Sequence, residues 1–224
     1  MTKPRFAGLD EALDALVAGR TIIVLDSEDR ENEGDLLAAA ETITPQAIHF
    51  MISEARGQLC MPVDPTIARR LGLTPMVPAN DPGTPRFAVP VDHRRCTTGI
   101  SPLERAFTIR EMLNPRNGPE DFVRPGHIFP LLAKRGGLLE RIGHTEATID
   151  LARMAGLTPA GVLCEVCSRD GLNMALCDEL SELAARFRLP MITIDAILEH
   201  RKAEAGGVPR ELEVSGLPEA CAAG

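Results

Sequence analysis

The segment VLDSEDRENEGDL, residues 24–36, places six acidic side chains within ten residues, beside the single cation Arg30. Carboxylates this close repel one another, so the segment is either a solvated loop or a site for a cation. In an extended chain, Glu31, Glu33 and Asp35 would face one way and converge on a ligand. Such oxygen ligands suit Mg²⁺ or Mn²⁺, whereas an EF-hand would need glycine at the position of Glu31. This segment alone leaves the metal site and the solvated loop equally open.

A second group of polar residues lies in ERIGHTEAT, residues 140–148. Thr145 stands where a helix is expected to begin, and the free N–H groups and positive dipole of a helix start attract anions. Arg141 can bind a phosphate through its guanidinium, and Gly143 lets the backbone come close. His144 is a candidate metal ligand or proton carrier. The alternative for this segment is a capped helix with an exposed histidine.

Two further residues are candidates for proton transfer. His127 ends RPGH, residues 124–127, where a polar loop is expected to give way to a strand, so it is either a base or a surface residue. Glu165 lies in the apolar run GVLCEV, and a carboxylate in a buried strand is costly unless it is paired or used. Cys164 and Cys167 form a C-x-x-C, but their odd spacing places them on opposite faces of a strand, which favours structural cysteines over a zinc site.

The chain around these motifs alternates between extended and helical patterns. This order predicts an α/β fold: a single compact domain, residues 1–205, with a mixed β-sheet flanked by helices, followed by a flexible C-terminal tail at 206–224. Ser101 with Glu104 predicts a capping box, and Asp178 predicts a further helix cap. The expected strands are 21–25, 36–40, 58–63, 86–91, 127–133, 160–166 and 190–194, and the expected helices are 9–18, 45–57, 65–72, 102–112, 145–156, 179–187 and one starting at 195.

Composition excludes several classes of partner. The net charge of −8 argues against nucleic acid, because phosphate backbones bind basic surfaces. No apolar run approaches the roughly 20 residues that span a bilayer, so no membrane partner is expected. The N-terminus lacks the apolar stretch of a signal peptide, which predicts a cytoplasmic protein.

Four blocks together resemble the 3,4-dihydroxy-2-butanone 4-phosphate synthase family. They are EDRENEGD at 28–35, RPGH at 124–127, GHTEAT at 143–148 and AGVLCE at 160–165, and the similarity extends from about Leu9 to Arg201. The resemblance implies a lyase of riboflavin biosynthesis, which converts D-ribulose 5-phosphate into L-3,4-dihydroxy-2-butanone 4-phosphate and formate. It also implies Mg²⁺ or Mn²⁺ as cofactor, and a homodimer with active sites near the dimer interface.

The same resemblance assigns roles to individual residues of this chain. Glu31 and His144 would bind the metal, and His127 and Glu165 would be catalytic. Cys60 and Thr98 have weaker claims to line the pocket. The residues expected to contact the substrate are Arg30, Glu31, Asp35, Arg141, Gly143, His144, Thr145 and Glu165.

Some positions depart from the family pattern. Glu104 stands where aspartate is usual, Leu132 where arginine is common and Ile142 where a small residue is usual. The segment SRDGLNMAL, residues 168–176, departs from the usual Asp-Asp-Gly followed by Met-Ala-Arg. None of these positions is a predicted metal ligand or catalytic residue, so the activity is still expected. Two rivals remain: a different metal-dependent sugar-phosphate enzyme, or an inactive paralogue that binds or regulates a partner. The family also occurs fused to a GTP cyclohydrolase II domain, and from the end of the sequence at residue 224 we expect the synthase reaction alone.

Overall fold

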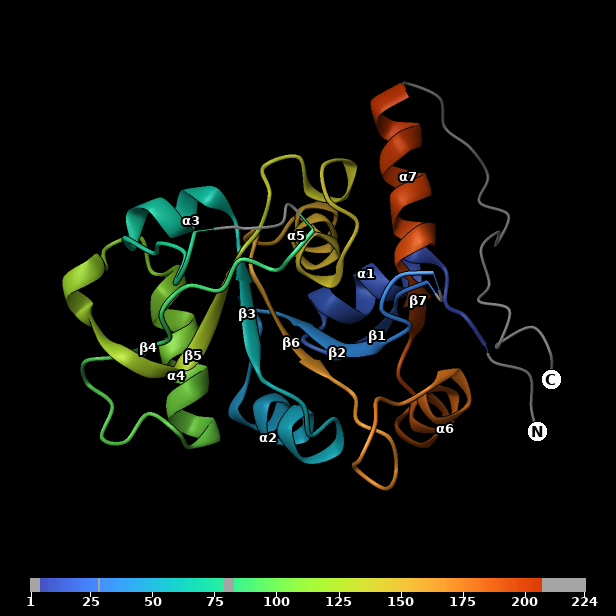
Figure 1. The fold of residues 1–224 in the computed structure, drawn as a ribbon, viewed down its shortest axis with the longest axis horizontal. Helices are drawn as coiled ribbons and strands as arrows, with labels where there is room; N and C mark the ends of the chain where they lie inside the picture. Colours follow the sequence, from blue (N-terminus) through green and yellow to red (C-terminus); the bar gives the residue numbers. More distant parts are fainter. Residues whose placement is uncertain (1–4, 28, 79–82, 207–224) are drawn as a thin grey trace.

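The computed structural model describes residues 5–27, 29–78 and 83–206. Its centre is a seven-stranded sheet in the order β4-β5-β3-β6-β2-β1-β7 (Figure 1). β1 runs parallel to β7 and β3 parallel to β5, while the other neighbours are antiparallel, which confirms the expected mixed α/β fold. The strands are β1 Ile22–Leu25, β2 Gly34–Ala39, β3 Cys60–Val63, β4 Val91–His93, β5 Phe122–Leu132, β6 Gly161–Glu165 and β7 Met191–Thr193.

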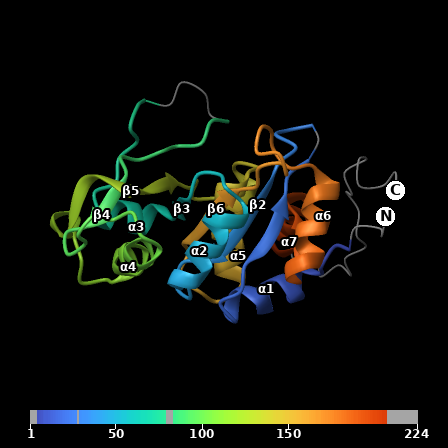
Figure 2. The same ribbon diagram turned by 90° about the horizontal axis from the view of Figure 1, so that it is seen from below.

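Helices cover both faces of this sheet. Successive strand residues alternate between two cores: Ile23 and Leu36 pack with α2, α4 and α6, whereas Ile22 and Leu37 pack with α1, α5 and α7. In Figure 1, α2, α4 and α6 lie below the sheet and α5 and α7 above it, and Figure 2 shows the same layers from below. The helices are α1 Leu9–Val17, α2 Pro45–Glu54, α3 Pro65–Arg70, α4 Pro102–Leu113, α5 His144–Met154, α6 Cys177–Phe187 and α7 Ile194–Gly206, with short 3₁₀ turns η1 Pro119–Asp121 and η2 Gly137–Leu139.

Side-chain caps explain several helix starts. The hydroxyl of Thr44 accepts a hydrogen bond from a backbone N–H of α2, and the carboxylate of Asp64 does the same for α3. Ser101 caps α4 as expected, but the Glu104 carboxylate turns to the preceding loop instead of completing the capping box. The expected cap at Asp178 is wrong, because α6 begins at Cys177 and this carboxylate accepts from the next N–H within the helix.

Two strands differ from the expected ranges. The predicted strand 86–91 forms only isolated bridges at Phe87 and Ala88, since Pro90 has no N–H to continue a ladder, and regular pairing begins at Val91. β5 begins at Phe122, five residues earlier than expected, because Phe122 and Val123 pair with His93 and Asp92 of β4. RPGH therefore lies within a strand and not at the end of a loop.

The register of the sheet sets the position of the candidate site. Asp35, near the start of β2, pairs with Val24 on one side and with Glu165 on the other. Paired residues share a face of a sheet, and Val24 belongs to the core under α5. The carboxylates of Asp35 and Glu165 therefore lie on the face that the first turn of α5 covers.

The final helix extends through Gly206. The rest of the predicted tail, 207–224, lies outside the described residues, so the domain boundary at 205 stays a prediction. Within the described part of the chain, no helix is both long and apolar enough to span a membrane.

Candidate active site

The acidic loop between β1 and β2 is organised by Asp26, directly after the buried strand. One oxygen of its buried carboxylate accepts the N–H of Ser27 at 2.8 Å. The other accepts from the guanidinium of Arg30 and from the N–H of Glu31 at 3.3 Å. The N–H of Asp26 donates to the carbonyl of Glu33 at 2.9 Å, which closes the loop. Asp26 was not predicted as a site residue, although a carboxylate directly after an apolar run is visible in the sequence.

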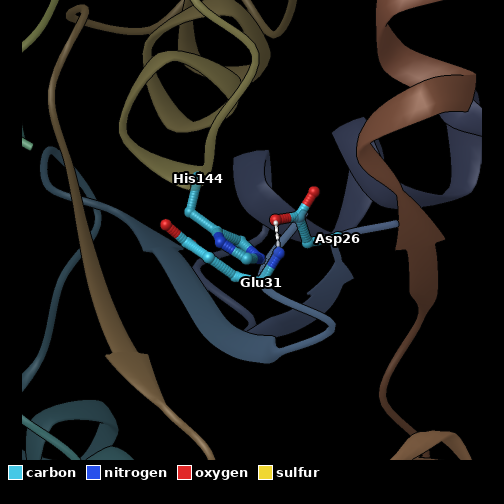
Figure 3. A group of neighbouring side chains, drawn as sticks. All are labelled: Asp26, Glu31 and His144. Carbon is cyan, nitrogen blue, oxygen red and sulfur yellow. Dashed lines mark hydrogen bonds between the residues drawn. The ribbon is translucent and has the colours of Figure 1, made fainter. Parts of the chain in front are cut away.

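Asp26, Glu31 and His144 form a candidate metal site. One ligand atom from each residue lies within 4.8 Å of the other two, and Figure 3 shows the side chains meeting from the β1–β2 loop and the start of α5. In the described part of the chain this is the one group of three or more potential ligands. Cys164 and Cys167, both free thiols, lie outside it, so the zinc alternative gains no support.

His144 is oriented as a metal ligand would be. Its Nε2 lies 3.1 Å from the carbonyl of Val24, which can only accept, so this nitrogen carries the proton. Burial lowers the pKa of His144, which favours the neutral ring. In that tautomer the lone pair is on Nδ1, the nitrogen that faces Asp35. A ligating histidine usually has its second N–H bound in this way. The alternative of an exposed histidine is wrong, since only 7% of the side chain is exposed.

Negative charge exceeds positive charge in this pocket. Burial, followed by the charge of Glu165, raises the pKa of Asp35 well above its ordinary value. Burial and the charge of Glu31 also raise the pKa of Glu33. The Asp35 Oδ2 lies 3.7 Å from His144 Nδ1, too far for a hydrogen bond, and its Oδ1 is buried with no partner among the described residues. A hard divalent cation fits this donor set of carboxylate oxygens and one imidazole.

Arg30 is the one cation that contacts this acidic group among the described residues. Its guanidinium forms two hydrogen bonds to the Glu31 carboxylate, at 2.7 and 2.8 Å, and a third contact to Asp26. Arg30 was predicted to hold substrate. In this structure it forms ion pairs with two members of the candidate metal site, Asp26 and Glu31, and offsets part of their negative charge.

A candidate anion site adjoins the candidate metal site at the start of α5. Gly143 precedes the helix, and a Cβ there would lie 2.6 Å from Arg141 Nη1 and 3.1 Å from Arg30 Nη2. The buried Arg141 donates to Glu146 at 2.5 Å and to the carbonyl of Gly83 at 2.9 Å. Its Nη2 is buried with no partner among the described residues. Two guanidinium groups, a close backbone and a helix start thus meet at one point, as an anion site requires.

Glu165 differs from its expected environment. It ends β6 and is half-buried, and its Oε2 accepts the N–H of Gln58 at 2.9 Å. The fully buried strand carboxylate is that of Asp35. Cys60 is buried on β3 opposite Leu163, while the hydroxyl of Thr98 donates to Glu104 in a loop near α4.

His127 lies apart from these groups. β3 separates its strand β5 from β6, and two strand spacings put it about 10 Å from the β6 backbone. Strand alternation places it on the same face as Phe129, which packs in the small core with Cys60 and Leu163. Its Nδ1 lies 2.6 Å from a carboxylate oxygen of Asp92, a partner that the sequence did not reveal.

The comparisons agree with the resemblance seen in the sequence. Residues 10–200 match the model of the 3,4-dihydroxy-2-butanone 4-phosphate synthase family. Riboflavin biosynthesis protein RibBA from Bacillus cereus strain AH187 is 50% identical over 211 residues, which cover 94% of this chain and 53% of that protein. RibBA from Bacillus velezensis is equally similar over the same shares. The chain spans about half the length of these curated relatives.

Solved structures show the same fold. RibBX, a two-domain 3,4-dihydroxy-2-butanone 4-phosphate synthase from A. baumannii, is 43% identical with a TM-score of 0.83, over 87% of this chain and 58% of that one. A 3,4-dihydroxy-2-butanone 4-phosphate synthase in complex with two magnesium ions is 34% identical with a TM-score of 0.82, over 91% of this chain and 100% of that one. The chain belongs to the 3,4-dihydroxy-2-butanone 4-phosphate synthase family.

Proposed function

We propose that this chain converts D-ribulose 5-phosphate into L-3,4-dihydroxy-2-butanone 4-phosphate and formate, as a lyase of riboflavin biosynthesis. The family match and the similarity to RibBA proteins support this reaction. The two products together contain all the atoms of the substrate, so the reaction needs no external oxidant or reductant.

The observation that carries the proposal is the acidic pocket beside the anion site. Asp26, Glu31 and His144 converge within 4.8 Å, and Gly143 beside His144 is approached by Arg141 and Arg30. A sugar phosphate has the matching shape, with a dianion at one end and vicinal oxygens at the other. Holding the phosphate at the start of α5 fixes which carbons face the pocket.

We propose Mg²⁺ or Mn²⁺ as the cofactor, with Glu31 and His144 as ligands and Asp26 beside them. A magnesium complex of a relative 34% identical supports this choice, as does the excess of carboxylates in the pocket. When bound, the ion supplies Lewis-acid polarisation of the neighbouring sugar oxygens.

The protein's own groups perform the other steps of the proposed reaction. Arg141 and Thr145 bind the phosphate through the guanidinium and the helix start. Asp35 and Glu165 orient the hydroxyl groups on the same face of the sheet. His127 acts as a proton carrier, because a ketose must lose the proton next to its carbonyl before the carbon skeleton rearranges.

A formate assay tests the proposal directly. Purified protein with ribulose 5-phosphate and Mg²⁺ should release formate and the four-carbon phosphate in equal amounts. Turnover of the substrate without formate would instead indicate a different metal-dependent sugar-phosphate enzyme. Binding of the substrate without any turnover would indicate an inactive paralogue.

We also propose a homodimer that works in the cytoplasm. Exposed apolar side chains lie on β5, on α4 and in the loops before β4 and α4: Val123, Leu103, Val89 and Ile100. Exposed apolar side chains grouped at one end of a folded domain are typical of a protein–protein interface. Light scattering should give twice the subunit mass of 24.1 kDa, and a monomer at working concentration would contradict the dimer. Cell fractionation tests the location.

A further inference from the structure

Asp92 contacts His127 at two points. One carboxylate oxygen accepts the backbone N–H of His127 at 2.9 Å, and the other lies 2.6 Å from its ring Nδ1. The Asp92 side chain is 7% exposed, whereas that of His127 is 41% exposed. The buried carboxylate therefore fixes both the main chain and the ring, and the opposite edge of the ring stays open.

We propose that Asp92 is a positioning residue that holds His127 in the Nδ1–H tautomer, with Nε2 free to take up a proton. The inference rests on the proposed function, in which His127 carries a proton. It follows from hydrogen-bond chemistry, since a carboxylate oxygen can only accept and Nδ1 must then donate. In the neutral ring this leaves the lone pair on Nε2, the nitrogen a general base needs.

The protein encloses the Asp92 carboxylate tightly, at the same oxygen that contacts the His127 ring. Gly99 has φ +81°, and a Cβ there would lie only 2.0 Å from the Asp92 carboxylate, so no other residue fits without displacing it. The strand pairing is also irregular at this point: the β4–β5 register shifts between Val91, which pairs with Ile128, and Asp92, which pairs with Val123. Bulges often redirect a side chain next to a functional site.

Glu104 keeps the Gly99 loop in place. Its carboxylate accepts from the N–H and hydroxyl of Thr97, the hydroxyl of Thr98 and the N–H of Gly99. The hydrogen bonds from Thr97 lower the pKa of Glu104 to about 2, so the carboxylate is ionised at neutral pH. Glu104 thus holds the loop backbone at Gly99, Gly99 lies against Asp92, and Asp92 contacts the His127 ring.

The two contacts distinguish positioning from simple structural support. Asp92→Asn keeps the size of the side chain, but its amide can donate a hydrogen to Nδ1 and so favour the opposite tautomer. Gly99→Ala would place a methyl group against the Asp92 carboxylate and displace it, without altering either member of the pair. Both variants should therefore change the state of the ring in the same direction.

The experiment is ¹⁵N NMR of protein labelled at histidine, with His127→Gln used to assign the resonance among the five histidines. At a pH where the ring is neutral, the parent should show a protonated Nδ1 and a lone pair on Nε2. Asp92→Asn and Gly99→Ala should shift this pattern toward a protonated Nε2. Asp121→Asn is the matched control, because Asp121 directly precedes β5 and forms an ion pair with Arg94, which directly follows β4, and this variant should leave the pattern unchanged.

Kinetics complete the test. Asp92→Asn should lower kcat by about 10²-fold, the lower end of what a positioned proton carrier contributes, with KM and Mn²⁺ affinity unchanged. A parent spectrum with a protonated Nε2 would overturn the inference, whether or not a variant folds. An unchanged tautomer and kcat in a folded Asp92→Asn would overturn it as well. If the parent shows the expected tautomer but releases no formate, the proposed function fails and the positioning contact stands.

Discussion

Two histidine–carboxylate groups on the same face of the sheet have opposite designs. His144 is buried, and its Nε2 donates to a backbone carbonyl. Its Nδ1 faces the carboxylate of Asp35, which has one buried oxygen without a hydrogen-bond partner among the described residues. His127 is partly exposed, and its Nδ1 is bound by the one carboxylate of Asp92. The free lone pair is therefore on Nδ1 of the buried His144, which faces Asp35, and on Nε2 of the partly exposed His127.

This difference indicates two kinds of chemistry. A buried group with several carboxylates and a neutral imidazole is stabilised by a cation, since an uncompensated buried charge is costly. A histidine with one carboxylate partner and an open nitrogen exchanges protons with its surroundings. The acidic pocket and the His127–Asp92 pair are thus expected to respond differently to the same kind of substitution.

The largest effect is expected at the two proposed metal ligands. Glu31→Gln and His144→Ala should each lower formate release by more than about 10³-fold, because the ion provides several kcal/mol of transition-state stabilisation. Asp29→Asn is the matched control in the same loop, since Asp29 is exposed, and it should retain the parent rate. Normal turnover in Glu31→Gln or His144→Ala would contradict the proposed difference between the acidic pocket and the His127–Asp92 pair.

A smaller loss is expected at the proton carrier. His127→Gln should lower kcat by about 10²- to 10⁴-fold while Mn²⁺ affinity, measured by calorimetry, stays within about twofold of the parent. A loss of turnover without a loss of Mn²⁺ affinity would show that His127 and His144 have different roles. Loss of Mn²⁺ affinity in this variant would instead place His127 in the metal site and contradict that difference.

The smallest effect concerns stability without metal. Burial raises the pKa of Asp35 in the folded protein, so its charged form destabilises the fold above the ordinary carboxyl range. Asp35→Asn should increase the free energy of unfolding in urea by about 1–3 kcal/mol at pH 8. The gain should shrink as the pH falls and vanish below the unfolded pKa of about 3.9. A gain independent of pH, or a loss at pH 8, would show that the Asp35 charge is already compensated.

Much of the fold was predictable from local signals. The mixed sheet, its buried strands and the cap at Ser101 follow from apolar patterns and short-range hydrogen bonds, and the structure confirms them. The strand at 86–91 was wrong because pairing depends on the partner strand, and Pro90 interrupts it. The cap at Asp178 was wrong because α6 begins one residue earlier, at Cys177, which places this carboxylate within the helix.

The candidate site was predictable in composition but only partly in geometry. The motifs named Glu31 and His144, and the structure brings them together with Asp26. Two partners were missed, Asp26 and Asp92, because each acts on a residue whose proximity depends on loop closure or on strand pairing. Such contacts have no fixed spacing in the sequence. The roles of the named residues stay predictions until they are tested.

The central claim is that His144, and not His127, binds the divalent cation. Electron spin echo spectroscopy of Mn²⁺ bound to protein labelled with ¹⁵N at histidine measures this directly. A coupling to one histidine nitrogen is expected in the parent and in His127→Gln, and it should be lost in His144→Ala. The absence of this coupling in the parent, or its persistence in His144→Ala, would show that His144 is not a ligand of the ion.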